Sequence, residues 1–266
     1  MSTAALQLEA HGGERRLMPV ARVLRLYVIE AKYETLRLLR NPSFIIPTLL
    51  FPIGFYLFFG LVLGGAQLLA HPAVSTYLYV NYGAYGVMAP GMFGFGVVLA
   101  IERQQGTFTL KRALPMPASA YLLAKMLMAL LFAAVVMLLL TTTAVAIGHL
   151  HLGAARILAV IAVNMLGTLP FCAIGLFVGA IVIGQSAVAI LNIIYLPTAF
   201  LGGVFFPLPK SMHSFAVMSP VYHLNQLGLS AAGVPSQGAP IIHIAVLAAV
   251  TVLFTALAIR RLARTG

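Results

Sequence analysis

Long apolar runs alternate with short polar stretches along this 266-residue chain, and the length of those runs gives the first prediction. A helix needs about 20 apolar residues to cross roughly 30 Å of hydrocarbon at about 1.5 Å per residue. The runs of sufficient length predict six transmembrane helices, over residues 43–65, 78–101, 119–148, 157–183, 187–206 and 239–260. The fourth and fifth runs are nearly continuous, and the short polar turn from Ile183 to Ala187 is the boundary between them.

A different pattern occupies residues 19–41, before the first run. At about 100° per residue, apolar positions that include Val20, Leu24 and Val28 fall on one side of a helix, and basic residues take the opposite side. A basic amphipathic helix of this kind lies in the headgroup plane of a membrane, and Pro42 ends it. The alternative is a positively charged flank without this geometry.

The segment after the fifth run is too interrupted by proline and glycine to cross a membrane, although it is apolar enough to lie in one. Met212, Phe215 and Met218 recur every three residues and predict a short re-entrant or interfacial helix before the last span. The predicted fold is therefore an all-α polytopic membrane protein. It consists of an N-terminal interfacial helix and a transmembrane domain over residues 43–260 that includes this segment.

Composition supports the membrane class and argues against nucleic acid as a partner. The chain is 61% hydrophobic and 8% charged, whereas soluble domains carry about 25% charged residues. The formal net charge of +11 would suit nucleic acid if the basic residues formed a patch on a soluble surface. They crowd beside the apolar runs instead, so we expect contact with membrane lipid and none with nucleic acid.

The distribution of lysine and arginine predicts the orientation. Seven precede the first span, four lie between the second span and the start of the third, and three lie at the C-terminal end. Fourteen of 16 therefore share one side, and only Arg156 and Lys210 fall on the other. The positive-inside rule then places both termini in the cytoplasm. We expect a multi-pass protein of the bacterial cytoplasmic (inner) membrane, with a polar tail at 1–18 and a basic tail at 261–266.

Motifs for chemistry within the chain are missing from the sequence. There is no G-x-x-x-x-G-K-[ST] loop to hold nucleotide phosphates. There is no aspartate, and the five glutamates fall outside the predicted spans or at a boundary, which argues against proton coupling through an intramembrane carboxylate. His149 and His151 lack further metal ligands, and Ser219, Tyr222 and His223 lack an acid on their side of the membrane. We therefore predict no catalytic residue and no metal site.

One charged stretch, ERQQGTFTLKRALP at residues 102–115, begins where the second span ends. Pro115 and Pro117 would stop a short helix that opens near Glu102, where a carboxylate would suit the positive end of the helix dipole. A chain without a motor of its own could receive force through this loop. The alternative is an ordinary solvated loop that obeys the positive-inside rule.

Two stretches resemble the markers of type-2 ABC transporter permeases. The first is Glu102-Arg103, then Gly106-Thr107 and Pro115, followed by Tyr121 and Lys125, and it is similar to the coupling segment of the family. The second is LGGVFFP at residues 201–207, followed by Pro209 and Ser219-Pro220, and it is similar to the family's outer motif. The likeness covers about residues 20–265. Many members carry an acidic residue where this chain has Thr109.

The resemblance implies the transmembrane permease subunit of an ABC exporter, which is not itself an enzyme and binds no cofactor. Such a subunit dimerises with itself or with a paralogue and sits on two copies of a separate ATPase that binds ATP and Mg. The residues implied for coupling to the ATPase are Glu102, Arg103, Gly106, Thr107, Leu110, Lys111, Arg112 and Pro115. Those implied for the outer motif are Leu201, Gly202, Gly203, Phe206, Pro207 and Pro220.

The cargo is less determined than the fold. An apolar lining without intramembrane charge favours an amphiphilic molecule such as a drug, an antibiotic or a lipid. Large or polar side chains within the spans suggest a path along Phe55, Tyr56, Phe59 and Asn192. Two alternatives stay open: a polysaccharide-exporting permease, or a non-transporting sensor or scaffold coupled to a partner ATPase or kinase.

Glycines within the spans predict close helix packing. Gly60-x-x-x-Gly64 and Gly175-x-x-x-Gly179 would each permit two helices to approach closely. The second span carries five glycines and Pro90, so we expect it to bend. The alternative is that glycine is simply common in membrane helices.

Overall fold

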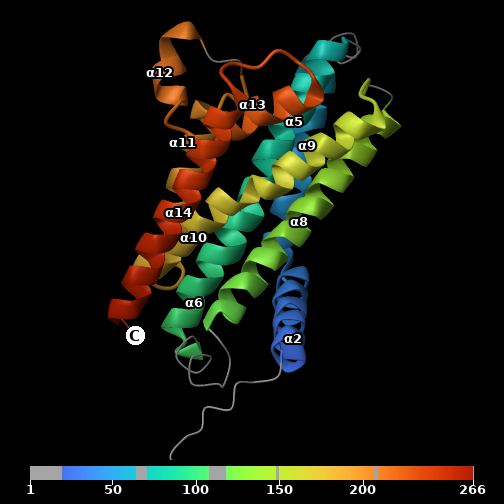
Figure 1. The fold of residues 1–266 in the computed structure, drawn as a ribbon. Coiled ribbons are helices and arrows are strands. Elements are labelled where there is room, and N and C mark those ends of the chain that lie inside the picture. The colour runs from blue at the N-terminus through green and yellow to red at the C-terminus, as the bar shows by residue number, and fades with distance from the viewer. Residues whose placement is uncertain (1–19, 64–70, 108–117, 148–149, 207–208, 266) are drawn as a thin grey trace, which may run out of the picture.

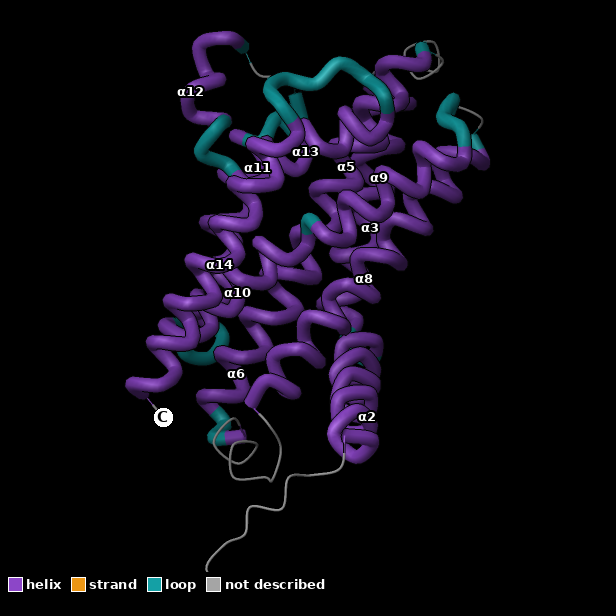
Figure 2. Tube along the Cα trace, viewed as in Figure 1, coloured by secondary structure: helices purple, strands orange, loops and turns teal. Residues whose placement is uncertain are grey.

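The structure is a computed structural model that describes residues 20–63, 71–107, 118–147, 150–206 and 209–265. Every regular element within these ranges is helical, so the predicted all-α class is confirmed (Figure 2). The helices form an elongated bundle (Figure 1).

Five helical stretches of the described residues are long and apolar enough to cross a membrane. They are Pro42–Val62, Pro72–Gln104, Tyr121–Ala146, Ala154–Ile181 and Pro240–Arg264. The first consists of α3 (Pro42–Leu57) and the π-helix η1 (Phe58–Leu63), and the second of α5 (Pro72–Ala89), the π-helix η2 (Pro90–Val97) and α6 (Val98–Gln104). The others are α8 (Ala118–Ala146), α9 (Ala154–Leu166) with α10 (Thr168–Ile181), and α14 (Pro240–Thr265).

The fifth predicted span corresponds to α11 (Ser186–Leu201), which has 16 residues. A helix of that length is about 24 Å long, somewhat less than the hydrocarbon thickness. Hydrogen bonds beside its two ends nevertheless reach the two ends of the second long helix. Just before α11 begins, the Gly184 N–H donates to the Ala100 carbonyl in α6 at 3.0 Å. Just after it ends, the Gly203 carbonyl accepts from the Tyr77 hydroxyl near the start of α5 at 3.2 Å.

One helix, α2 (Val20–Leu39), lies across an end of the bundle. In Figure 1 it is foreshortened, so that its turns overlap, while α8 and α14 run across the view. It packs mainly against α8, with Ala31, Glu34 and Leu38 buried on one side and Val28 and Tyr33 exposed. The α6 end and the C-terminal end of α14 lie at this same end of the bundle. That the helix rests in the headgroup plane stays a prediction.

The opposite end carries η3 (Lys210–Met212), α12 (His213–Ala216) and α13 (Pro220–Ala232) (Figure 1). Met212, Phe215 and Met218, which predicted the helix here, have exposed side chains on or beside α12. The buried helix of this segment is α13, which packs between α5, α9 and α14. It ends at Gly233, whose φ of +74° is the left-handed conformation that favours glycine at a helix C-terminus.

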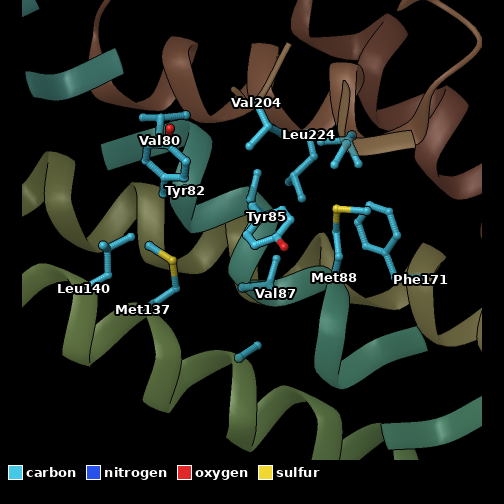
Figure 3. Packing of buried hydrophobic residues seen from close by; sticks show 14 of the residues in the cluster. Val80, Tyr82, Tyr85, Val87, Met88, Met137, Leu140, Phe171, Val204 and Leu224 are labelled. Carbon is cyan, nitrogen blue, oxygen red and sulfur yellow. The ribbon is translucent and has the colours of Figure 1, made fainter. Parts of the chain in front are cut away.

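The core surrounds α5, which belongs to the most buried of the five long helices. Tyr82, Tyr85 and Met88 of α5 lie between Met137 and Leu140 of α8 on one side and the α10 and α13 helices on the other (Figure 3). Phe171, Val204 and Leu224 belong to the same buried cluster and are labelled in the same view.

Glycines bring η2 and α10 into backbone contact. A Cβ added at Gly96 would lie 2.6 Å from the Gly175 carbonyl oxygen, and one at Gly179 would lie 2.5 Å from the Gly96 carbonyl oxygen. The close approach predicted for Gly175-x-x-x-Gly179 is therefore confirmed. The Gly- and Pro-rich part of the second span forms the eight-residue π-helix η2. Gly64, of the other predicted pair, lies outside the described residues.

Candidate coupling site

Glu102 lies in the last turn of α6, with its side chain only 2% exposed. The expectation that it opens a new helix is wrong, because the second long helix continues through it to Gln104. A carboxylate in the last turn faces the negative end of the helix dipole, which is unfavourable unless cations lie nearby.

Those cations come from two other helices. Arg37 of α2 donates from Nη1 to Glu102 Oε1 at 2.6 Å, and the Tyr121 hydroxyl of α8 donates to Oε2 at 2.5 Å. The Nζ of Lys125, one turn further along α8, lies 3.5 Å from the same Oε2. One carboxylate thus joins the ends of α2, α6 and α8.

Lys125 is fully buried and also bonds α2 directly. Its Nζ donates to Glu34 Oε2 at 2.8 Å and lies 4.9 Å from the centroid of the Tyr121 ring. We call Glu34, Arg37, Glu102, Tyr121 and Lys125 the charge cluster. It holds two carboxylates and two cations, so the formal charges of these five residues balance. Glu34, Glu102 and Lys125 are buried, and Arg37 is partly exposed.

Helical spacing explains why these five side chains can meet. Glu34 and Arg37 are three residues apart on α2, and Tyr121 and Lys125 are four apart on α8, so each pair lies on one face of its helix. Sequence reasoning had assigned no role to Glu34, and had counted Lys125 toward the membrane orientation and the resemblance to the family's coupling segment, without expecting it to bind α2. The prediction that the five glutamates fall outside the spans or at a boundary did not anticipate that Glu34 and Glu102 are buried beside cations.

Arg103 connects α6 to the turn between α10 and α11. Its Nη1 donates to the Gly179 carbonyl at 2.9 Å and approaches the Val182 carbonyl at 3.5 Å. Both carbonyls belong to the C-terminal end of α10, where a cation is favourable. The predicted coupling residue Arg103 therefore has partners inside the chain.

The remaining predicted coupling residues divide into two groups. Gly106 and Thr107 are exposed at the start of the loop; Gly106 has a φ of +72°, and the Thr107 hydroxyl donates to the Glu102 carbonyl at 3.1 Å. Leu110, Lys111, Arg112 and Pro115 lie outside the described residues.

The outer motif forms an anchored turn at the end of α11. Gly203 adopts a φ of +71°, and its carbonyl accepts from Tyr77 at 3.2 Å and from the Asn81 amide at 3.4 Å. The Gly202 carbonyl accepts from the Asn225 amide of α13 at 2.9 Å. A Cβ at Gly202 would lie 2.7 Å from Val221, so this position has no room for a side chain. The motif therefore joins α11 to α5 and α13.

The other members of the motif surround this turn. Leu201 is half-buried, Phe206 is exposed, and Pro220 begins α13. Pro207 lies outside the described residues.

The four residues suggested for a cargo path do not meet in one place. Phe55 and Phe59 lie on one face of the first helix and pack with Phe205, at centroid distances of 5.5 and 6.3 Å. Tyr56 is completely buried in the core. Asn192 is exposed on α11, where its amide nitrogen donates to the Val188 carbonyl of its own helix at 3.0 Å.

The aromatic rings around Phe55 form a larger group than the sequence suggested. We call Phe55, Phe59, Tyr82, Tyr85 and Phe205 the aromatic cluster; it brings together the first helix, α5 and the outer motif. The tyrosines at positions 82 and 85 were visible in the sequence, but their distance from Phe205 in the chain concealed the contact.

Comparisons with known proteins show which family the chain belongs to. The family model of ABC-2 type transporters matches residues 25–234. The chain belongs to this family. The matched region includes both the charge cluster and the outer motif, and the resemblance seen in the sequence is confirmed.

A Bacillus subtilis (strain 168) protein, YvfS, is named as a transport permease and is 28% identical to this ABC-2 family chain over 195 residues. The alignment covers 72% of this chain and 79% of the relative. A transport permease is consistent with a protein that is not itself an enzyme.

Proposed function

We propose that this chain is the transmembrane subunit of an ATP-driven exporter, energised by a separate ATPase that docks near residues 102–115. The observation that carries the proposal is the position of Glu102: at the base of this loop its carboxylate binds side chains from α2 and α8. Two ATPase copies, two permease subunits and a location in the bacterial inner membrane complete the proposed assembly.

Force applied to the loop would reach four helices through contacts described above. The charge cluster joins α6 to α2 and α8, and Arg103 joins α6 to the end of α10. The Gly184–Ala100 hydrogen bond connects α6 to the turn that precedes α11. Closure of the ATPase pair would thus move the end of the second helix and the start of α11 together.

The proposed topology has six crossings with both termini in the cytoplasm. α10 ends near Arg103, while α14 begins at the opposite end of the bundle, so the chain must cross between them. The intervening helix is α11, and its contacts with α6 at one end and α5 at the other support a sixth crossing. α2 would then lie at the cytoplasmic surface.

A test of the proposal compares two sets of variants in proteoliposomes with the partner ATPase. We expect Arg103→Gln to lower cargo-stimulated ATP turnover about five- to tenfold while ATPase binding persists, because it breaks the link to α10; losses of this size match coupling free energies of about 1–3 kcal/mol. Lys111→Glu with Arg112→Glu should weaken ATPase binding instead. Phosphate release measures ATP turnover, and co-purification measures ATPase binding.

Each outcome separates the proposal from its alternatives. If no ATPase co-purifies with the wild-type chain, the exporter proposal fails. If the ATPase binds but no cargo stimulates turnover, the sensor or scaffold alternative is favoured. Stimulation by oligosaccharides and not by amphiphiles would indicate polysaccharide export.

Asn192 supports a dimer that buries the exposed face of α11. Its hydrogen bond to Val188 uses one amide hydrogen, and the carbonyl oxygen and second hydrogen would be costly to expose to lipid. A second copy of the chain, or an aqueous cargo path beside it, would satisfy them. Homodimerisation along α11 therefore agrees with the suggested role of Asn192.

We expect Asn192→Leu to weaken the dimer roughly three- to tenfold, as measured by single-molecule subunit counting across a dilution series in lipid, since interhelical polar contacts contribute about 0.6–1.5 kcal/mol. The matched control is Thr142→Leu, because Thr142 is also exposed on a long helix and bonds its own backbone, at the Leu139 carbonyl. A dimer unchanged by Asn192→Leu would place the subunit interface elsewhere.

An amphiphilic cargo is supported by the aromatic cluster and by the apolar side chains exposed on α11. Ile193, Leu196 and Phe200 are exposed beside Asn192. A surface that combines aliphatic, aromatic and single amide groups suits drug-, antibiotic- or lipid-like molecules better than a carbohydrate chain, which needs rows of polar partners.

A further inference from the structure

Two histidines meet at the end of the bundle opposite the charge cluster. His223 lies on α13 and His243 on the first turn of α14, and both side chains are buried. Their Nδ1 atoms are 2.8 Å apart. The Nε2 of His223 lies 2.9 Å from the Val217 carbonyl oxygen, and the Nε2 of His243 lies 2.7 Å from the Gln237 carbonyl oxygen.

These three distances indicate how many protons the pair holds. A carbonyl oxygen only accepts hydrogen bonds, so both Nε2 atoms must carry a hydrogen. A neutral imidazole has a single N–H, so two neutral rings would direct two bare Nδ1 lone pairs at each other across 2.8 Å. Contact at that distance requires a proton between them. The pair therefore holds three protons on four nitrogens and carries one positive charge.

We propose that His223 and His243 form a binding site for a single proton, and that this proton fastens α13 to α14. Release of the proton leaves two facing lone pairs, and uptake of a second leaves two facing N–H groups. Either change removes the Nδ1 hydrogen bond. A neutral pair could keep the hydrogen bond between the two Nδ1 atoms only if one ring carried its hydrogen on Nδ1 and not on Nε2. The Val217 or Gln237 carbonyl would then lack its donor.

Neighbouring side chains hold the site in place. The Gln237 backbone N–H donates to the Gln226 side chain at 2.7 Å, and the Tyr222 hydroxyl donates to Gln237 Oε1 at 3.2 Å. The Tyr222 ring stands edge-on to both imidazoles. The proton thus joins two helices, and the same rings bond the loops that precede each helix, at Val217 and Gln237.

No carboxylate competes for the proton. The chain has no acidic residue after Glu102, so α9 to α14 contribute none, and α5 contributes only tyrosines. Among the described residues of the helices packed on α13, Arg156 of α9 lies against Gly233, ten residues and about 15 Å along α13 from His223. α10 and α11 offer only Cys172 and Tyr195, and the arginines of α14 lie at its far end. His213 of α12 is half-buried.

The pH range of the bridge follows from these groups. Burial lowers the pKa of His223 below its ordinary value, the Val217 carbonyl opposes this, and His243 lowers it further. The same causes disfavour a second proton on the pair, because it would place two positive charges side by side. The bridge is lost when falling pH adds that second proton and when rising pH removes the single proton. Because one proton separates the two states, the ratio of molecules with the Nδ1 hydrogen bond to molecules without it should fall tenfold per pH unit above the pH at which the proton is released.

The test is a histidine titration of the full chain in nanodiscs, with 13Cε1-labelled histidine observed by NMR between pH 5 and 9. The chain has seven histidines, and His223→Gln and His243→Gln assign the two signals. We expect both signals to move together in one step that corresponds to a single proton. Two independent titrations, one for each ring, would overturn the proposal, as would two rings that stay neutral down to pH 5.

A second measurement tests the histidine site without a transport assay. Glutamine at position 243 can donate a hydrogen bond but cannot titrate, so His243→Gln should abolish the pH dependence of hydrogen exchange in α13 after correction for the intrinsic rate. The matched control His213→Gln should retain it. A wild-type pH profile in His243→Gln would contradict the site, whether or not an ATPase or cargo is identified.

Discussion

Replacing Lys125 with methionine is expected to cost about 3–5 kcal/mol of folding free energy, because it removes one partner from a buried ion pair. Methionine keeps most of the apolar stem but not the ammonium group. Glu34 and Glu102 would then share the end of the bundle without the cation that lies 2.8 Å from one and 3.5 Å from the other. Equilibrium unfolding of the detergent-solubilised full chain measures the loss.

Two further variants isolate the charge. Lys125→Met combined with Glu34→Gln removes one positive and one negative group together and leaves Glu102 with Arg37 and Tyr121. This double variant should regain most of the lost stability. Lys32→Met is the surface control, since Lys32 is exposed on α2, and should change stability by less than about 0.5 kcal/mol. Wild-type stability in Lys125→Met, or no recovery in the double variant, would show that the cluster contributes little.

The charge cluster also shows where sequence reasoning stopped. Apolar runs predict helices well, because a segment that crosses lipid must satisfy its backbone within itself. Which charged side chains meet depends instead on how α2 crosses the bundle end, and no periodicity records that. Lys125 was thus placed on the cytoplasmic side and within the family resemblance, but nothing in the pattern indicated that its side chain is completely buried.

The outer motif and the histidine pair show the same limit. LGGVFFP was recognised as a pattern, but the reason for its glycines depends on Tyr77, Asn81 and Asn225, which reach the turn from two other helices. His223 and His243 are 20 residues apart on separate helices, so no helical spacing pairs them. Their carbonyl partners belong to loops whose geometry the sequence does not reveal.

Glycine packing was the tertiary contact that the sequence did predict, and it gives the second large effect. We expect Gly96→Ala to cost about 1–3 kcal/mol or more, because the new methyl group would lie 2.6 Å from a backbone oxygen of α10 that no rotamer change can move. Gly54→Ala is the matched control: Gly54 also lies in a membrane helix, with nothing within 4 Å of the added Cβ, and its replacement should be neutral or slightly stabilising. Thermal unfolding of the purified chain compares the two.

The same contact can be approached from the other helix, which makes the prediction sharper. A Cβ at Gly179 meets the Gly96 carbonyl, so Gly179→Ala should force η2 and α10 apart in the same way as Gly96→Ala. Because one separation relieves both clashes, the double variant should cost less than the sum of the two single variants. Additive losses would mean that the two clashes are relieved by different movements. Separation would also draw the Gly179 carbonyl away from Arg103, so the stability loss and the weakened coupling expected for Arg103→Gln should appear together in these glycine variants.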